Sequence, residues 1–343
     1  MDKFINTKPI RLIELFAGIG SQAKALKNLH IPFESHFVCE YDGFAVASYN
    51  AIHGTNYEIC NIMDITAADL NITHTHQFTY LLTYSFPCQD LSVAGKGAGM
   101  EKGSGTRSGL LWEVERLLNE CVELPQLLLM ENVTQVHGTK NKGDFDRWIK
   151  FLESKGYKNY WQDLNSKDFG MPQNRNRCIM VSILGDYSFE FPQKTTLKLE
   201  MRNLLESDVS EEYDVNHDCY NYYLDMEDKQ NGTKWQGRCN NDVINPVIAH
   251  TLSVRGTRHQ RPGVSNIISK KNTHEISVRE YKKNFSIGDL RWLTPKECWR
   301  LMGFNDNDFA KAKAVCNNTQ LYKQAGNSIV VNMLMAVFWE LLL

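Results

Sequence analysis

The first 185 residues alternate between short apolar runs and stretches with helical periodicity, and this alternation constrains the fold more than any other feature. The apolar runs, rich in β-branched or aromatic residues, lie at 10–16, 36–40, 80–84, 127–131 and 177–184. The helix-like stretches lie at about 22–30, 44–52, 108–121 and 144–155. Such alternation predicts an α/β fold, with a largely parallel sheet covered by helices on both faces. Ligands bind such sheets at the carboxyl ends of the strands.

The composition changes after Pro192, which predicts more than one domain. Residues 1–192 form the expected α/β domain, and the polar, Asn-rich residues 193–288 form a smaller, irregular domain that contains β-strands. Residues 289–343 again have helical patterns, and we expect them to pack back on the first domain.

The apolar run after Ser328 is shorter than the roughly 20 residues that span a bilayer, and it contains Asn332 and Glu340. It therefore predicts a packed helix and no membrane contact. The N-terminus lacks the apolar core of a signal peptide, so we expect a cytoplasmic protein.

The net charge of −2 hides a strong asymmetry along the chain. Residues 234–283 hold ten basic and three acidic side chains, a net charge of +7, whereas residues 196–230 hold three basic and ten acidic ones, a net charge of −7. Charge alone supports two interpretations equally, a polyanion-binding face and an unevenly charged solvated surface.

Nine cysteines are spread along the chain without a Cys-x-x-Cys pair or a Cys/His cluster in the sequence. This odd number and spacing argue against a disulfide framework and against a structural zinc, so no metal is expected. For any one of these cysteines, the default interpretation is a buried apolar thiol.

The stretch "LIELFAGIGS" joins the first predicted strand to a helix through two glycines. Glycines at this place let backbone N–H groups approach a ligand at a helix N-terminus. The third glycine of the dinucleotide fingerprint is missing, which disfavours NAD. Alone, this turn is also common as plain structure. The candidate ligand-binding residues are Phe16, Ala17, Gly18, Ile19 and Gly20.

Two further loops complete a predicted adenosine site. Glu40 ends the next strand about 20 residues past the glycines, where an acid can bind both ribose hydroxyls. Tyr41 offers an apolar face for adenine, while Asp64 and Ile65 supply an acceptor for the amino group and an apolar lid. Alternatively, Asp64 caps a helix near residues 66–70. S-Adenosylmethionine fits such a site, because no pyrophosphate is required.

Cys88 follows a buried strand in a loop, the kind of place where catalytic groups are displayed. The Gly-rich stretch 94–109 behind it predicts a mobile loop that closes over a substrate. Glu131 ends the next strand and is a candidate general acid. Arg175 and Arg177, two residues apart on an extended segment, would face the same side and bind a carbonyl or phosphate. Taken singly, each residue has a structural alternative. Cys88 could be a packed thiol, Glu131 could equally be a helix-capping or salt-bridged acid, and the two arginines could be a surface ladder.

Together these stretches resemble the cytosine-C5 DNA methyltransferase family over nearly the full chain. The matching stretches are "FAGIG", "CEYD", "SFPCQDLSVAGKG", "RSGLLWEVERL", "MENV", "QNRNR", "TLS", "LTPKECWRLMGF" and "YKQAGNSIVVN", and they stand in the family's usual order. Ser21 and Ser85 replace glycines that are frequent in the family, and both are small residues.

The resemblance implies a Rossmann-like, class I methyltransferase fold and a metal-free reaction. Cys88 would add as thiolate to C6 of a cytosine, Glu131 would bind N3 and the exocyclic amine, Arg177 would bind O2, and Arg175 the neighbouring backbone. The methyl group would come from S-adenosylmethionine. Residues implied to help hold the cofactor are Pro87, Leu110, Asn327 and Ser328.

The resemblance also implies a double-stranded DNA substrate from which the target base is extruded. Gln89, Ser92 and Lys96 would lie near the substrate, and Thr251 would contact the backbone near the flipped nucleotide. The side chains expected to reach the major groove are Arg255, Arg258, His259 and Gln260. We expect a monomeric, stand-alone prokaryotic or phage enzyme, with or without a separate cognate restriction endonuclease.

Three rival functions fit the sequence less well. A tRNA cytosine methyltransferase predicts a smaller recognition region than the roughly 95 residues that follow Pro192. An inactive DNA-binding homologue predicts loss of the nucleophile or of cofactor residues, yet Cys88, Glu131, Arg175 and Arg177 are all present. A thiol hydrolase needs a base beside Cys88, and the histidines stand in no recognisable partner motif.

Overall fold

The computed structural model describes residues 2–91, 99–215, 243–252, 266–271, 273–277, 280 and 287–343. Two compact units divide the chain. The first unit comprises Met1–Asn165, Asn176–Lys194 and Val331–Leu343, and the second comprises Ser166–Arg175 and Thr195–Val330. Residues 289–330 therefore group with the second unit and only the last 13 residues with the first. The three-part functional division given above stays a prediction.

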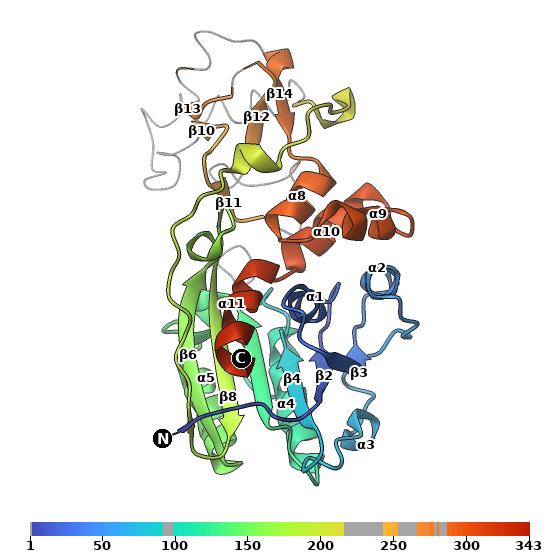
Figure 1. Cartoon of the computed structure of the whole chain (residues 1–343), viewed down its shortest axis with the longest axis vertical. Coiled ribbons are helices and arrows are strands. Elements are labelled where there is room, and N and C mark those ends of the chain that lie inside the picture. Colours follow the sequence, from blue (N-terminus) through green and yellow to red (C-terminus); the bar gives the residue numbers. More distant parts are fainter. Residues whose placement is uncertain are drawn as a thin grey trace. The chain divides into compact units, whose positions relative to one another are not determined.

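A six-stranded sheet forms the centre of the first unit, in the order β3-β2-β4-β5-β8-β6 (Figure 1). Its strands are β2 (Ile10–Leu15), β3 (Phe33–Cys39), β4 (Thr79–Tyr84), β5 (Leu127–Asn132), β6 (Tyr157–Asn165) and β8 (Asn176–Leu184). The first four strands pair in parallel, whereas β8 runs antiparallel to both β5 and β6. The expected α/β fold is confirmed, with an antiparallel edge on an otherwise parallel sheet.

Helices cover both faces of this sheet, as expected (Figure 1). They are α1 (Ser21–Asn28), α2 (Gly43–His53), α3 (Ala67–Leu70), α4 (Leu111–Glu120), α5 (Lys142–Ser154) and α11 (Val331–Leu342). Buried side chains of α4 and α5, including Trp112 and Trp148, pack with the strands in one core cluster. On the other face, α1 packs against α11. The short strands β1 (Asp2–Lys3) and β9 (Tyr187–Ser188) pair separately.

The C-terminal apolar run is helical. Within the described residues, the stretch Asn318–Leu342 is long and apolar enough to cross a membrane by length and composition alone, and 67% of its most apolar window is buried in the protein. In α11, Val331, Leu334, Val337, Phe338 and Leu341 are buried, which agrees with the packed helix expected. The cytoplasmic location stays a prediction.

The described part of the second unit contains a small sheet and several helices. The sheet has the order β13-β10-β12-β14, and β7 pairs with β11 separately. The elements are β7 (Gln173–Asn174), β10 (Val243–Ile244), β11 (Ala249–His250), β12 (Ile267–Ser269), β13 (Ile276–Ser277), β14 (Leu290–Trp292), α8 (Pro295–Leu301), α9 (Asp306–Lys313) and α10 (Asn318–Asn327). Val215, Ile244, Ile267, Leu290 and Trp292 form one core cluster at this sheet.

The stretch "LTPKE" forms the capped N-terminus of α8. Thr294 is the N-cap and accepts a hydrogen bond from the N–H of Glu297, whose carboxylate accepts the N–H of Thr294 in return. Pro295 occupies the first turn, where its missing N–H costs nothing. The buried Glu297 carboxylate also binds both terminal nitrogens of Arg291, at 2.8 and 2.9 Å. This motif therefore has a structural role.

Candidate active site

The glycine loop turns the chain sharply from β2 into α1. Phe16, Gly18 and Gly20 all have positive φ angles, of 58°, 57° and 78°. A Cβ added at Gly18 would meet open space, whereas one at Gly20 would lie 2.3 Å from Nε2 of His53. The backbone at Gly18 is therefore open to an approaching ligand, and Gly20 is required by both its conformation and its packing.

This difference predicts the effect of two matched substitutions. Gly18→Ala is expected to cost about 1–2 kcal/mol, the strain of a left-handed alanine. Gly20→Ala is expected to cost a further 1–3 kcal/mol or so, because a methyl group collides with the His53 ring. Urea unfolding of both variants checks this order. Equal losses of stability would show that the contact with His53 does not constrain the loop.

His53, which the sequence did not single out, holds the glycine loop from the end of α2. Its Nε2 lies 3.0 Å from the carbonyl oxygen of Ile19, and its Nδ1 lies 3.1 Å from Nζ of Lys27. An ammonium group can only donate, so Nδ1 accepts this bond and Nε2 carries the proton given to Ile19. No sequence motif marks this histidine, because its role depends on how α2 packs.

Glu40, at the end of β3, binds the glycine loop directly. One carboxylate oxygen accepts the N–H of Gly18 and the other accepts the N–H of Asp42, both at 2.8 Å. Burial raises the pKa of Glu40, while these hydrogen bonds oppose that shift. Each carboxylate oxygen can accept a second hydrogen bond, so the pair of hydroxyls on a ribose can still be bound.

The loop that contains Asp64 and Ile65 lies beside Glu40. The N–H of Cys60 donates to the carbonyl of Glu40 at 2.9 Å. Asp64 is exposed, and Ile65 packs on the rim of the core cluster. The alternative that Asp64 caps the following helix is wrong, because Thr66 is the N-cap of α3. Tyr41 is 75% exposed, which leaves its ring free to cover a ligand.

Beneath the glycine loop, the fully buried Glu14 carboxyl accepts a 2.6 Å hydrogen bond from Tyr49 Oη. Burial raises the pKa of Glu14 from 4.5 to about 7. An acid with a raised pKa binds its proton more tightly in the folded chain. Its stabilising contribution is therefore complete below pH 4.5 and is lost as the pH rises through about 7.

This pKa shift predicts a pH-dependent effect of Glu14→Gln. Between pH 4.5 and pH 8 the wild-type protein should lose about 3 kcal/mol of unfolding free energy relative to this variant, from about 1.4 kcal/mol per pKa unit. Urea unfolding of both proteins across this range measures the difference. A constant difference would show that Glu14 does not titrate there.

Cys88 lies half-buried in the loop after β4, on the rim of the core cluster. The start of the α4 region holds this loop. Ser108 donates from Oγ to the carbonyl of Pro87 at 2.7 Å. The buried Asp90 carboxylate accepts the backbone N–H groups of Arg107 and Ser108, at 2.8 and 3.3 Å. Asp90 and Ser108 are positioning residues that the sequence reasoning missed, although both stand within matching stretches.

The carboxyl end of β5 connects Glu131 to the same loop. The side-chain amide of Asn132 donates to the carbonyl of Phe86 at 3.0 Å. Glu131, almost fully buried, forms an ion pair with Arg177 on β8, with Oε1 2.9 Å from Nε. The structure thus brings together the predicted loop of Cys88, the predicted acid and one predicted arginine, all within the first unit.

Arg175 differs from Arg177 in its surroundings. The extended segment expected around both arginines is interrupted, because Arg175 lies between β7 and β8. Its buried guanidinium belongs to the second unit and donates to the carbonyl oxygens of Leu252, Gly326 and Ser328, at 3.1, 2.9 and 2.8 Å. It thereby joins the "QNRNR", "TLS" and "GNS" stretches. Its contact with a substrate stays a prediction.

The other candidate residues differ in how far the structure describes them. Thr251 donates from Oγ1 to the carbonyl of Asn174, and Asn327 is exposed at the end of α10, both in the second unit. Leu110 packs on the core cluster, and Gln89 accepts a hydrogen bond from Arg107. The candidate DNA contacts that lie outside the described residues are Ser92, Lys96, Arg255, Arg258, His259 and Gln260.

Only part of the basic segment is described. Lys270 forms an ion pair with Asp214, and Lys271 forms one with Asp289 at 2.8 Å. The remaining basic residues of this segment lie outside the described residues. Its role in binding a polyanion stays a prediction.

Comparisons with known proteins identify the family and the fold of the chain. A family model described as C-5 cytosine-specific DNA methylase matches residues 10–342. "Type II methyltransferase M2.ScrFI" of Lactococcus lactis subsp. cremoris is 34% identical, over 97% of this chain and 99% of its own length. "Orphan methyltransferase M.SPBetaI" of Bacillus phage SPbeta is 28% identical, over 97% of each. The solved methyltransferase EhMeth of Entamoeba histolytica shares the fold, with a TM-score of 0.76 at 19% identity over 98% of each chain.

The fold is that of a Rossmann-like methyltransferase with an additional unit. The chain belongs to the C-5 cytosine-specific DNA methylase family, and it is a site-specific DNA (cytosine-5-)-methyltransferase. Enzymes of this family use S-adenosylmethionine.

Proposed function

We propose that the first unit methylates C5 of a cytosine with Cys88 as the covalent nucleophile. The observation that carries this proposal is the connection between three groups. Asn132 holds the loop before Cys88, Glu131 precedes Asn132 on β5, and Arg177 pairs with Glu131. A nucleophile, a carboxyl group and a guanidinium are thereby held at neighbouring strand ends.

These side chains have separate roles in the reaction. The Cys88 thiolate adds to C6, which forms a C–S bond and moves ring electrons toward C5. Glu131 hydrogen-bonds N3 and the exocyclic amine, and Arg177 hydrogen-bonds O2, so that the charge on the ring is stabilised. Once C5 carries the methyl group, loss of its proton and of the thiolate restores the aromatic ring. S-Adenosylmethionine, when bound, supplies that methyl group.

The glycine loop fits this cofactor. Gly18 leaves its backbone open to a ligand, and Glu40 keeps acceptor capacity for two hydroxyl groups. Tyr41 would cover the adenine, and Asp64 would accept its amino group. The other residues proposed to surround the cofactor are Phe16, Ala17, Ile19, Gly20, Ile65, Pro87, Leu110, Asn327 and Ser328.

We infer that the substrate is double-stranded DNA from which the target base is flipped, since C5 is otherwise inside the base stack. Residues of the second unit would contact this DNA. We expect a monomer, and a role beside a separate restriction endonuclease is supported by the type II methyltransferase among its relatives.

The nucleophile can be tested by trapping. DNA synthesised with 5-fluorocytosine in place of every cytosine carries no proton at C5, so the enzyme cannot complete the elimination. With S-adenosylmethionine present, we expect a stable adduct whose peptide map locates the DNA on Cys88. An adduct on another cysteine would contradict the proposal. So would the absence of any adduct, provided that the enzyme binds the DNA and methylates the same sequence with ordinary cytosine.

A further inference from the structure

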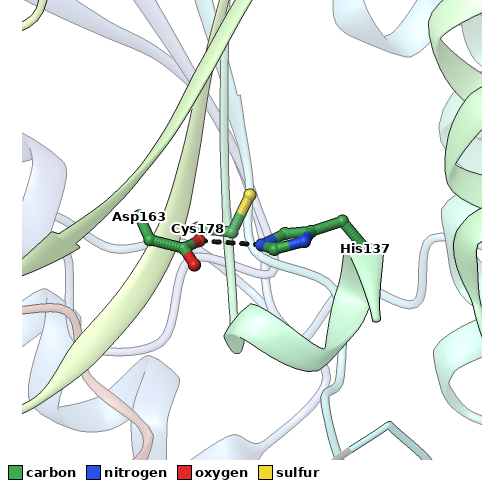
Figure 2. A group of neighbouring side chains, drawn as sticks. All are labelled: His137, Asp163 and Cys178. Carbon is green, nitrogen blue, oxygen red and sulfur yellow. Dashed lines mark hydrogen bonds and ion pairs between the residues drawn. The ribbon is translucent and has the colours of Figure 1, made fainter. Parts of the chain in front are cut away.

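Three side chains far apart in the sequence meet at one edge of the first unit (Figure 2). They are His137 at the end of the 3-10 turn η2 (Thr134–His137), Asp163 on β6 and Cys178 on β8. Their nitrogen, oxygen and sulfur atoms all lie within 4.8 Å of one another. This group is not used by the proposed reaction, and sequence analysis did not find it because none of the three residues stands in a metal-binding motif.

The sheet and the neighbouring rings fix these positions. Asp163 and Cys178 are direct partners in the antiparallel ladder of β6 and β8, so their side chains project from the same face. The His137 imidazole donates from Nε2 to Asp163 Oδ1 at 2.9 Å. It also packs against Trp161, with ring centroids 4.7 Å apart. A rigid scaffold of this kind favours ligand binding, because little ordering entropy is lost.

Access to the group is one-sided. Cys178 is fully buried, whereas the side chains of His137 and Asp163 keep exposed fractions of 24% and 33%. An ion could therefore enter between the imidazole and the carboxylate and meet the sulfur at the bottom. The same opening leaves one coordination position for water.

The donor set selects a particular kind of ion. Thiolate and imidazole prefer zinc and similar transition metals over Mg²⁺ or Ca²⁺, which prefer oxygen alone. Zinc bonds of about 2.0–2.3 Å place tetrahedral ligand atoms roughly 3.5 Å apart. Because the ligand atoms of this group lie within 4.8 Å of one another, a movement of at most about 1.3 Å brings any pair to that spacing.

We propose that His137, Asp163 and Cys178 form a zinc site with three protein ligands and one open position. Binding replaces the hydrogen bond between His137 and Asp163 with two metal bonds, and the neutral imidazole then binds through Nε2 with its proton on Nδ1. The Cys178 thiol releases its proton to solvent as the Zn–S bond forms. The sequence-based expectation of no metal considered only residues close together in the sequence. Strand pairing brings these three together from distant parts of the chain.

The position of the proposed site also predicts an effect on the stability of the enzyme. Cys178 follows Arg177 on β8 and is the ladder partner of Asn132, which follows Glu131 on β5. A bound zinc would cross-link η2, β6 and β8 immediately beside the ion pair of Glu131 and Arg177. We therefore expect zinc to stabilise these strand ends and to raise the Tm of the enzyme.

Cobalt(II) and zinc binding to the purified full-length enzyme test the proposal without any measure of activity. After metal removal, we expect one cobalt per chain with a near-ultraviolet thiolate-to-cobalt charge-transfer band, and one zinc that displaces it. Cys178→Val should abolish the band, and Asp163→Asn should weaken binding at least tenfold. Cys298→Val, which changes a buried thiol of the second unit, should bind like the wild-type enzyme.

Two results would overturn the proposal. No stoichiometric binding by folded wild-type enzyme would overturn the proposal, and so would binding that is unchanged in both Cys178→Val and Asp163→Asn. Circular dichroism shows whether each variant folds. If Cys178→Val does not, the partly exposed Asp163→Asn decides the question alone: weakened binding supports the site and unchanged binding overturns it.

Discussion

The Cys88→Ser variant is expected to lose methyl transfer by at least about a thousandfold while its fold stays intact. The hydroxyl group of serine is a far weaker nucleophile than a thiolate, and removing a covalent nucleophile costs several kcal/mol of transition-state stabilisation. Cys88 is only half-buried, so the smaller oxygen leaves no large cavity. Transfer of a radioactive methyl group from S-adenosylmethionine to DNA measures the loss.

Cys121 provides a matched control for this substitution. It is also half-buried and packs on the same core cluster, but burial raises its pKa to about 11, so it stays a thiol at neutral pH. Cys121→Ser should keep activity within a few-fold of the wild-type rate. Substantial methylation by a folded Cys88→Ser variant would remove Cys88 from the mechanism.

The second large effect is expected at Glu131. Glu131→Gln keeps the size of the side chain but removes its capacity to ionise and to exchange a proton, so kcat should fall by about 10²–10⁴-fold. Because the ion pair with Arg177 is almost fully buried, the variant should also be less stable, by up to about 3–5 kcal/mol. Kinetics and urea unfolding of the same preparations separate the two effects.

A double-mutant cycle distinguishes a chemical role of the Glu131–Arg177 pair from a purely structural one. The Glu131→Gln, Arg177→Gln double variant contains no buried charge without a partner, so part of the stability should return. Activity should not return with it, because both side chains act on the cytosine in the proposed reaction. Recovery of activity in parallel with stability would show that the pair has only a structural role.

The sequence predicted the buried strands well and the edge of the sheet poorly. The strands β4 and β5 are buried at every position, which makes them continuous apolar runs. In contrast, β6 is buried only at Tyr157 and Leu164, and its polar sequence gave no strand signal. Its position depends on pairing with β8, which is a tertiary effect.

For the site, the sequence identified residues but not the bonds between them. Cys88, Glu131, Arg177 and Glu40 were predicted, each near an end of a strand or in the loop that follows it. The hydrogen bonds of Asn132, Ser108 and His53 could not be predicted, because they join segments far apart in the chain. The same limit concealed the cluster of His137, Asp163 and Cys178.

The central claim is that this chain methylates cytosine at C5 within a specific DNA sequence through Cys88. Base-resolution mapping of 5-methylcytosine, in a bacterial host without methylation of its own, tests it most directly. We predict methylation confined to one short motif when the wild-type protein is expressed, and none with Cys88→Ser. An unmethylated genome in cells that contain soluble wild-type protein would contradict the account, and modified cytosine in tRNA of those cells would then identify the alternative substrate.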